Sequence, residues 1–465
     1  MAKQVTQGTF DDVVKENIQE FEMTIGAAIT DAVQQFESQG VNLAMIIRDP
    51  SLYSADGEKV VHPVIVALNS LSSDQPEDVD VSNLEVVKQE CDVDLSRRCF
   101  AGKNDAYKVL LKSIQKYKNV NKDLFVKALQ TMCSLCNGQP DLLDQQGAEE
   151  FMNIMKDENC DRLITELIVR LVRLNCTKHE MNRRIFVKLD LIKELVKVLK
   201  KNKSCITIVK EVAFGLRVLT QDDDVRVPFG SAHENAKQIV MEGDALRELI
   251  DICKEHTNDV SVQAELFNTV SKLVVRDEFC QEVKDLGGLD LILKSFHANI
   301  THKGIVKQAL VVLKALAGND DIKVAIVKAG GVPLVLAAMT QHQGNATVCA
   351  SGCLAIATFV LRQPDHCTVV MDNDGHQMIL QAMKVHPKDE IVQKQACMAV
   401  RNIVARNREL CDPFLEFGAE ELINRARALP SCEDEAKAAL RDLGCQVDLK
   451  ERWTGERGSL QQEAY

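Results

Sequence analysis

The sequence predicts an all-α protein built from one helical unit that is repeated along the chain. A pattern recurs in the order helix, turn, helix with aliphatic anchors, and longer apolar helix. The turns fall at positions 102, 147, 190, 243, 287, 330, 374 and 418, so the spacings are 45, 43, 53, 44, 43, 44 and 44 residues. Aromatic residues make up only 4% of the chain, and an apolar mass of Leu, Val, Ile and Ala suits packed helices better than strands.

Each element of this pattern has a physical reason. A tight turn between two helices often needs a positive φ, which glycine adopts without steric cost, and glycine stands at or beside most of these turns. In the longer helices, apolar residues at i, i+3, i+4 and i+7 mark a buried face. The tripeptide at 307–309 recurs at 394–396, 87 residues later, which is two periods. We therefore expect about eight repeats over residues 86–444.

This period and helix order resemble the armadillo repeat, which implies one short and two longer helices per unit and a right-handed superhelical solenoid. HEAT repeats have a similar length but two helices, and they remain the structural alternative; the glycine turn and the stretch 396–404 favour armadillo. The segments 35–41, 138–144, 222–230 and 438–445 resemble the armadillo repeat-containing protein six family. That resemblance reaches both ends of the chain and implies a non-enzymatic protein.

The regions outside the repeats have a different composition. Residues 1–48 carry two apolar stripes at helical spacing, and we expect two amphipathic helices. These helices either cap the solenoid or pack on each other, or they dock on a partner. Residues 49–85 are acidic and predict a partly flexible linker. Residues 445–465 form a charged C-terminal tail, in which Trp453 is expected to cover the last repeat.

Charge is distributed unevenly along the chain, whose net charge is −12. Residues 1–100 hold 7 Lys and Arg against 18 Asp and Glu, whereas residues 162–217 hold 14 against 5. The overall acidity argues against general nucleic-acid binding. No apolar run reaches the roughly 18–20 residues that span a bilayer, and the first residues lack the apolar block of a signal peptide. We expect no membrane association and an intracellular, cytoplasmic protein, with nuclear presence also compatible.

Signals of catalysis or metal binding are weak. Cys133 and Cys136 have the spacing of zinc ligands but lack a second pair, and they lie in an apolar helical pattern where cysteine packs as a small hydrophobe. The chain has no phosphate-cradling loop, and neither His179 nor His233 has the second histidine of a zinc-protease helix. We expect no enzyme activity, no cofactor and no metal.

A protein-binding scaffold is the function that the pattern favours, because the last helix of each repeat in a solenoid lines an extended binding face. In armadillo proteins an Asn ladder on that helix holds an extended peptide. Asn402 matches this ladder, while the six preceding positions carry other residues. The candidate groove residues are Arg170, Arg173, Lys210, Phe214, Arg217, Asn268, Lys272 and Asn402.

The basic middle suggests what such a groove could bind. Arg170 and Arg173 share a helix face, and Phe214 precedes the next ladder position by one turn, so a basic, partly aromatic floor is expected. It would favour an acidic extended peptide, from a partner or from the chain's own residues 74–94; alternatively these charges are solvated surface. A nuclear-transport adaptor of importin-alpha type is the second function considered, but it needs an aromatic ladder of which only Phe214 is present.

The spacing of 53 residues places an insertion of about ten residues after the third repeat. Long insertions in compact repeats are usually functional or disordered. Its polar run could bind a cation or a basic partner; alternatively Asp223 or Asp224 pairs with Arg226, and Phe229 anchors the loop. The candidate residues of this insertion loop are Asp222, Asp223, Asp224, Arg226, Phe229 and His233.

Overall fold

The fold is all-helical in the computed structural model, which describes residues 3–55, 57–73 and 75–447. These residues contain isolated bridges between Lys3 and Val41 and between Tyr53 and Lys59, but no strand. The chain divides into two compact units, unit 1 (Met1–Glu248) and unit 2 (Leu249–Tyr465). Helix α14 (Ala245–Glu255) runs across this division. The predicted all-α fold class is thus confirmed for the part of the chain that the structure describes.

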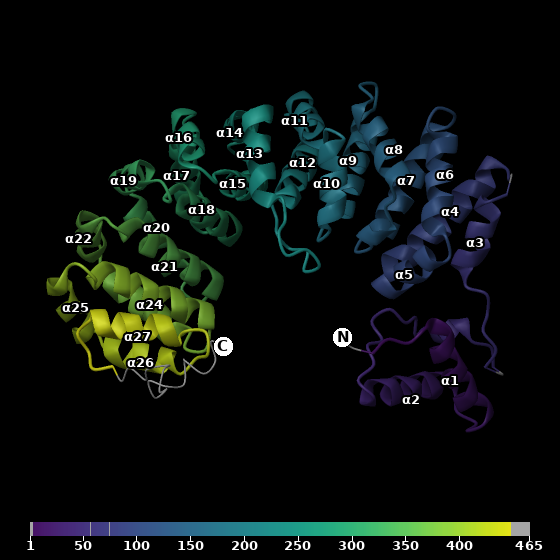
Figure 1. The fold of residues 1–465 in the computed structure, drawn as a ribbon, viewed down its shortest axis with the longest axis horizontal. Coiled ribbons are helices and arrows are strands. Elements are labelled where there is room, and N and C mark those ends of the chain that lie inside the picture. The colour runs from purple at the N-terminus through teal and green to yellow at the C-terminus, as the bar shows by residue number, and fades with distance from the viewer. Residues whose placement is uncertain (1–2, 56, 74, 448–465) are drawn as a thin grey trace, which may run out of the picture. The chain divides into compact units, whose positions relative to one another are not determined.

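The described residues of unit 1 form the helices α1 to α13, the start of α14 and the 3-10 turns η1 and η2 (Figure 1). They are α1 (Gln7–Gln19), α2 (Ile25–Ser38), η1 (Pro50–Leu52), α3 (Pro63–Leu71), α4 (Glu77–Val93), α5 (Leu95–Lys103), α6 (Ala106–Tyr117), α7 (Lys122–Cys136), η2 (Pro140–Leu142), α8 (Gln145–Lys156), α9 (Arg162–Cys176), α10 (Glu180–Lys188), α11 (Leu191–Lys201), α12 (Ile206–Leu219) and α13 (Ala232–Gly243). The long helices α4, α7, α9 and α12 pack against one another in chain order. They form one continuous layer of this unit.

The first two helices pack on each other through their apolar stripes. The ring centroids of Phe10 and Phe36 lie 5.9 Å apart, and Val14 and Ile29 belong to the same buried cluster. Helices α1 and α2 therefore pack on each other, as one of the arrangements considered for residues 1–48 predicted.

Residues 49–85 contain more helix than the linker prediction allows, because α3 and the first half of α4 lie within them. The acidic side chains in the first turn of α4 stabilise this helix, because they lie at the positive end of its dipole. Leu84, Val87 and Cys91 are fully buried, and α4 packs against α7 like the long helices that follow. The layer of long helices therefore begins before residue 86.

Unit 2 repeats the same order of helices. They are α15 (Val260–Leu273), α16 (Asp277–Asp285), α17 (Gly288–Ala298), α18 (Lys303–Leu316), α19 (Asp320–Lys328), α20 (Gly331–Gln341), α21 (Ala346–Val360), α22 (Pro364–Asp372), α23 (Gly375–Val385), α24 (Glu390–Val404), η3 (Arg408–Leu410), α25 (Cys411–Glu416), α26 (Ala419–Arg427) and α27 (Glu433–Asp442). The long helices α15, α18, α21, α24 and α27 again pack in chain order. Trp453 and most of the predicted tail lie outside the described residues.

The turn before the second helix of most repeats contains one residue in the left-handed region. Glycine holds this position at 287, 330 and 418, with φ between 76° and 82°. Aspartate holds it at 105, 190, 244 and 374, because a short polar side chain tolerates this conformation better than most. Two expected turns are wrong: Gly102 lies inside α5 and Gly147 inside α8. A Cβ atom at Gly147 would lie 1.8 Å from the Tyr107 hydroxyl, so close packing explains that glycine.

Within the described part of the chain, no single helix is long and apolar enough to cross a membrane. The pair α19 and α20 passes the same test of length and composition only when taken together, with a bend of 70° between them. All sixteen cysteines are free thiols, and thirteen of them are buried.

Candidate protein-interaction surface

The stripe of each long helix that faces solvent forms what we call the ladder face. In unit 1 it includes Glu85 and Lys88 on α4, Gln130 on α7, and Glu166 and Arg170 on α9, all of which are partly exposed. Their spacing of three or four residues places the members from one helix on one side of it. The opposite sides of these helices carry the fully buried Leu, Val and Ile of the core.

A hollow of about 720 Å³ opens on this face across α4, α7 and α9. Its lining combines charged, amide and aliphatic side chains: Glu85, Lys88, Asp92, Gln130, Cys133, Ser134, Asn137, Leu163, Glu166, Leu167, Arg170, Arg173 and Leu174. Of the sequence-predicted site residues, it holds Arg170 and Arg173. Gln130, Ser134 and Asn137 add amide and hydroxyl groups, which can donate and accept hydrogen bonds to a peptide backbone.

The two arginines converge on a carboxylate of the next long helix. Arg170 Nε lies 2.8 Å from Glu211 Oε1, and Arg173 Nε lies 2.8 Å from Glu211 Oε2. Arg170 Nη2 also donates to Glu166 at 2.6 Å. Burial lowers the pKa of Arg170, but the hydrogen bond and charge of Glu211 outweigh it and leave that pKa raised. The sequence left open whether these arginines form a basic floor or solvated surface charge; in the structure they form an ion-paired network with Glu211.

An aromatic ring stands between two guanidinium groups beside this network. The guanidinium carbon of Arg173 lies 4.3 Å from the ring centroid of Phe214, and that of Arg217 lies 4.9 Å from it. Cations at such distances are attracted to the ring face. Phe214 keeps 37% of its surface exposed while Arg217 is buried, so the ring contacts both arginines and is still partly open to solvent. Lys210, on the same helix, is partly exposed and has a bonding partner of its own.

The chain's own acidic segment does not fill this hollow as a peptide. Residues 77–93 are folded as α4, whose Glu85, Lys88 and Asp92 supply one wall. The alternative in which residues 74–94 occupy the groove is therefore wrong, because the segment is one of the long helices that form it.

The insertion loop between α12 and α13 is fastened to α10 by buried charge. Arg183 is fully buried; its Nε donates to the Cys176 carbonyl at 2.9 Å, and its terminal nitrogens reach the Gln221 carbonyl and the Asp223 carboxylate. Asp224 accepts from the Glu180 backbone N–H at 2.9 Å.

Asp224 also pairs with Arg226 Nε at 2.8 Å, as one interpretation of the loop predicted. Hydrogen bonds from Arg226 and from the Glu180 backbone hold the pKa of Asp224 well below its usual range. Phe229, however, does not anchor the loop: 85% of its surface is exposed. The ion pairs hold the loop instead. His233 is exposed in the first turn of α13.

In unit 2 the predicted ladder residues lie on α15 and α24. Asn268 is partly exposed and Lys272 is exposed. Asn402 Nδ2 donates to the Ala357 carbonyl of α21 at 2.9 Å. Its carboxamide thus already bridges two long helices.

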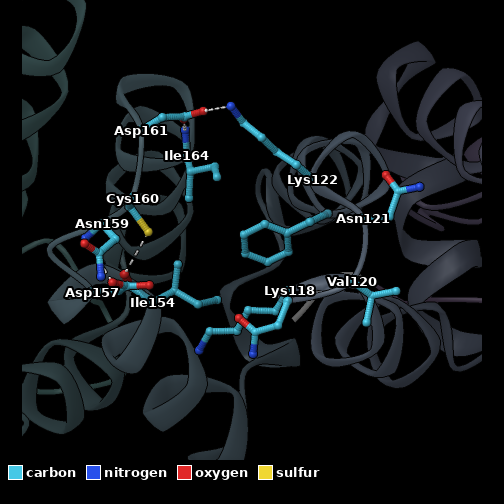
Figure 2. A pocket seen from close by; sticks show the side chains of 12 residues that line it. Lys118, Val120, Asn121, Lys122, Ile154, Asp157, Asn159, Cys160, Asp161 and Ile164 are labelled. Atoms are coloured by element: carbon cyan, nitrogen blue, oxygen red, sulfur yellow. Dashed lines mark hydrogen bonds and ion pairs between the residues drawn. The ribbon is translucent and has the colours of Figure 1, made fainter.

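A second hollow in unit 1, which the sequence did not point to, lies at the start of two long helices (Figure 2). It measures about 390 Å³ and lies between the loops that lead into α7 and α9. At its rim Lys122 Nζ forms an ion pair with Asp161 Oδ2 at 2.5 Å, and Cys160 Sγ donates a hydrogen bond to the Ile154 carbonyl. Asp161 also caps α9 by accepting from the Ile164 N–H. Lys122, Cys160 and Asp161 thus already bond to other groups of the protein.

The paired cysteines of the sequence lie in the core. Burial raises the pKa of the Cys133 thiol to about 12 and the pKa of the Cys349 thiol to about 11. Cys136 and Cys353 are also buried. A search of the described residues for three or more His, Cys, Asp or Glu side chains placed to hold one metal ion finds no such group.

Helix triplets joined by left-handed turns, with their long helices stacked in chain order, define an armadillo-repeat protein. The likeness to solved structures agrees with this class. A crystal structure of an engineered protein aligns with a TM-score of 0.66 at 17% identity, covering 95% of this chain and all of that one. A β-catenin structure, from work on its interaction with cadherin, aligns with a TM-score of 0.55 at 16% identity, covering 81% of this chain and 69% of that one.

Sequence comparison then gives the family. The ARMC6 family model matches residues 59–462, and the Armadillo repeat-containing protein 6 N-terminal domain model matches residues 2–62. The chain is 42% identical to Armadillo repeat-containing protein 6 of Homo sapiens over 99% of this chain and 94% of that one. It is 38% identical to the Drosophila melanogaster homolog, over 98% of each chain. The chain belongs to the armadillo repeat-containing protein 6 family, as its resemblance predicted.

Proposed function

We propose that this protein is a non-enzymatic scaffold that binds an extended segment of a partner protein along the ladder face of unit 1. The observation that carries the proposal is the hollow across α4, α7 and α9, where amide and hydroxyl groups lie beside Leu163 and Leu174. Such a lining suits a peptide, because backbone groups need donors and acceptors while side chains need apolar contact. The β-catenin structure named above comes from a protein of this fold that interacts with cadherin.

The charge of unit 1 limits which segment could bind. Arg170 and Arg173 already hold Glu211, so an acidic partner would have to displace that carboxylate. Two kinds of segment avoid the cost of displacing Glu211 from its arginines. One carries both acidic and basic side chains, so that a base can pair with Glu211; the other lies beside the network and bonds Gln130 and Ser134. The hollow therefore favours a segment that leaves the Glu211 network in place over a purely acidic one.

A steric block tests the proposal. Gln130 lies on the ladder face and lines the hollow, whereas Gln115 is exposed on α6. Twelve-residue peptides would be selected from a displayed random library on the full chain, and their affinities measured by fluorescence anisotropy. Gln130→Trp should weaken a peptide that binds in the hollow at least tenfold, and Gln115→Trp should leave it unchanged. Equal binding by both variants, or no selected peptide, would refute the hollow as the binding site.

We also propose that the protein works inside the cell. Sixteen free thiols support this location, because oxidising compartments favour disulfides. Fractionation of cells that express a tagged full chain would test it, and recovery mainly from the medium would contradict it.

A further inference from the structure

The ladder face of unit 2 differs in chemistry from that of unit 1. Its central apolar row consists of Val311 on α18, Leu354 on α21 and Met398 on α24, and all three are partly exposed. They are 43 and 44 residues apart, so they occupy the same position in successive repeats. The same position on α15 is Asn268. Helices α18, α21 and α24 pack against one another in chain order (Figure 1). The three apolar residues therefore form a row across neighbouring helices.

Lysines flank this apolar row at one end. Lys272 on α15 and both Lys307 and Lys314 on α18 are exposed. Lys307 and Lys314 lie four residues before and three residues after Val311, so all three share a helix face. Among the residues that the structure describes, no carboxylate pairs with any of these three lysines.

One carboxylate, that of Glu265 on α15, also lies on this face, because Glu265 is partly exposed and stands three residues before Asn268 and seven before Lys272. At the opposite end of the face the cations are paired. Lys394 and Arg401 of α24 pair with Glu435 and Asp442 of α27, at 3.1 Å and 3.5 Å. Helix α21, between the two ends, presents Thr347, Ser351, Leu354 and Thr358 and no charge. The face thus runs from an end where three lysines outnumber one carboxylate, over an uncharged strip of hydroxyl and aliphatic side chains, to neutral ion pairs.

We infer that the ladder face of unit 2 is a second docking surface, which binds an acidic, partly apolar peptide segment. Carboxylates of that segment would meet Lys272, Lys307 and Lys314, and its aliphatic side chains would cover Leu354 and Met398. Packed helices lie about 8–10 Å apart and an extended chain rises about 3.3 Å per residue. A segment of about ten residues therefore reaches from α15 to α24. This surface goes beyond the proposed function, because it shares no residue with the hollow of unit 1.

The test uses the full chain and a twelve-residue peptide array with fixed alternate leucines and either fixed glutamates or fixed lysines. The wild-type protein should retain the glutamate series and not the lysine series, with binding that weakens as salt rises. Lys272→Glu with Lys314→Glu should weaken the glutamate peptides about tenfold, because two favourable charge contacts become unfavourable. A matched control, Lys284→Glu with Lys328→Glu on the outer helices α16 and α19, makes the same charge change and should leave affinity within twofold.

The apolar half of the inference has its own variant. Met398→Gln keeps the length of the side chain and removes its apolar end, so it should weaken the same peptides several-fold without altering helix content. Gln130→Trp should have no effect on them, since it acts on unit 1. Preference for the lysine series, equal loss in the control variant, or loss with Gln130→Trp alone would each overturn the inference. That last outcome would leave the proposed function standing.

Discussion

We predict that Arg183 is essential for holding the insertion loop against α10. We call the hydrogen bonds and ion pairs of Arg183 and Asp224 with their partners the clasp of this loop. The Arg183 guanidinium is fully buried and bonds the Cys176 carbonyl, the Gln221 carbonyl and the Asp223 carboxylate. Arg183→Met keeps most of the volume but leaves these acceptors without a donor. Breaking a buried charged pair costs about 3–5 kcal/mol, and because 32% of the Asp223 side chain is exposed we expect the lower value, ~3 kcal/mol.

Hydrogen exchange is the appropriate assay, because repeats open locally and a single unfolding free energy is poorly defined for such chains. The backbone N–H of Ser231 donates to Glu180 at 2.8 Å and reports on the clasp. A loss of ~3 kcal/mol corresponds to exchange about 100-fold faster at this amide. Arg184→Met is the control: its side chain is 39% exposed and bonds Glu180 and the Phe229 carbonyl, so we expect less than about a fivefold change. Similar exchange rates in Arg183→Met and Arg184→Met would refute the claim that the buried charge of Arg183 holds the loop.

Three further predictions concern packing, thiols and pH. Gly331→Ala places a Cβ 2.5 Å from Ile326 Cγ2. It should lower the free energy of local opening of α19 and α20 by about 2 kcal/mol, which corresponds to amide exchange about 30-fold faster in these helices. Gly344→Ala meets no atom within 4 Å and should change the free energy of local opening by less than about 0.5 kcal/mol. Although burial opposes it, hydrogen bonding at the start of α12 lowers the pKa of Cys205, so iodoacetamide should modify Cys205 first, and peptide mass spectrometry showing another thiol reacting faster would contradict this. The pKa of Asp224 is lower in the folded protein than in the unfolded chain. The ionised carboxylate therefore stabilises the loop at any pH above its unfolded pKa, and this stabilisation is lost only as pH falls through the folded pKa. Hydrogen exchange in the loop should thus stay slow down to about pH 4, and opening of the loop near pH 6 would disprove this prediction.

The repeat period was predictable because it depends on local chemistry. Helical periodicity and glycines with positive φ are properties of short stretches, so the turns at 287, 330 and 418 could be located from the sequence pattern and its spacing. The left-handed Asp105 could not, since aspartate is also common in ordinary turns. Gly147 misled for the converse reason: its smallness serves Tyr107, which approaches from another helix.

The acidic stretch before residue 86 shows a different limit. Its carboxylates suggested a linker, yet Asp80 is buried in α4 and accepts from the Tyr117 hydroxyl. The partner lies 37 residues away, so no local pattern announces it. The same holds for Glu211, which takes the charge of Arg170 and Arg173 from positions 41 and 38 residues away. The sequence placed the two arginines correctly on one face, but their free charge could be judged only with the neighbouring helix in place.

The contrast between the two ladder faces has a consequence for how each could select a ligand. In unit 1 the cations Arg170 and Arg173 are held by Glu211, so a competing carboxylate gains only the difference between two similar ion pairs. Selectivity there must come from shape and from hydrogen bonds with groups such as Gln130. In unit 2, Lys272 and Lys314 have no carboxylate partner among the described residues, so an acidic ligand gains each contact outright. Charge can therefore select a ligand on unit 2 but can do little to select one on unit 1.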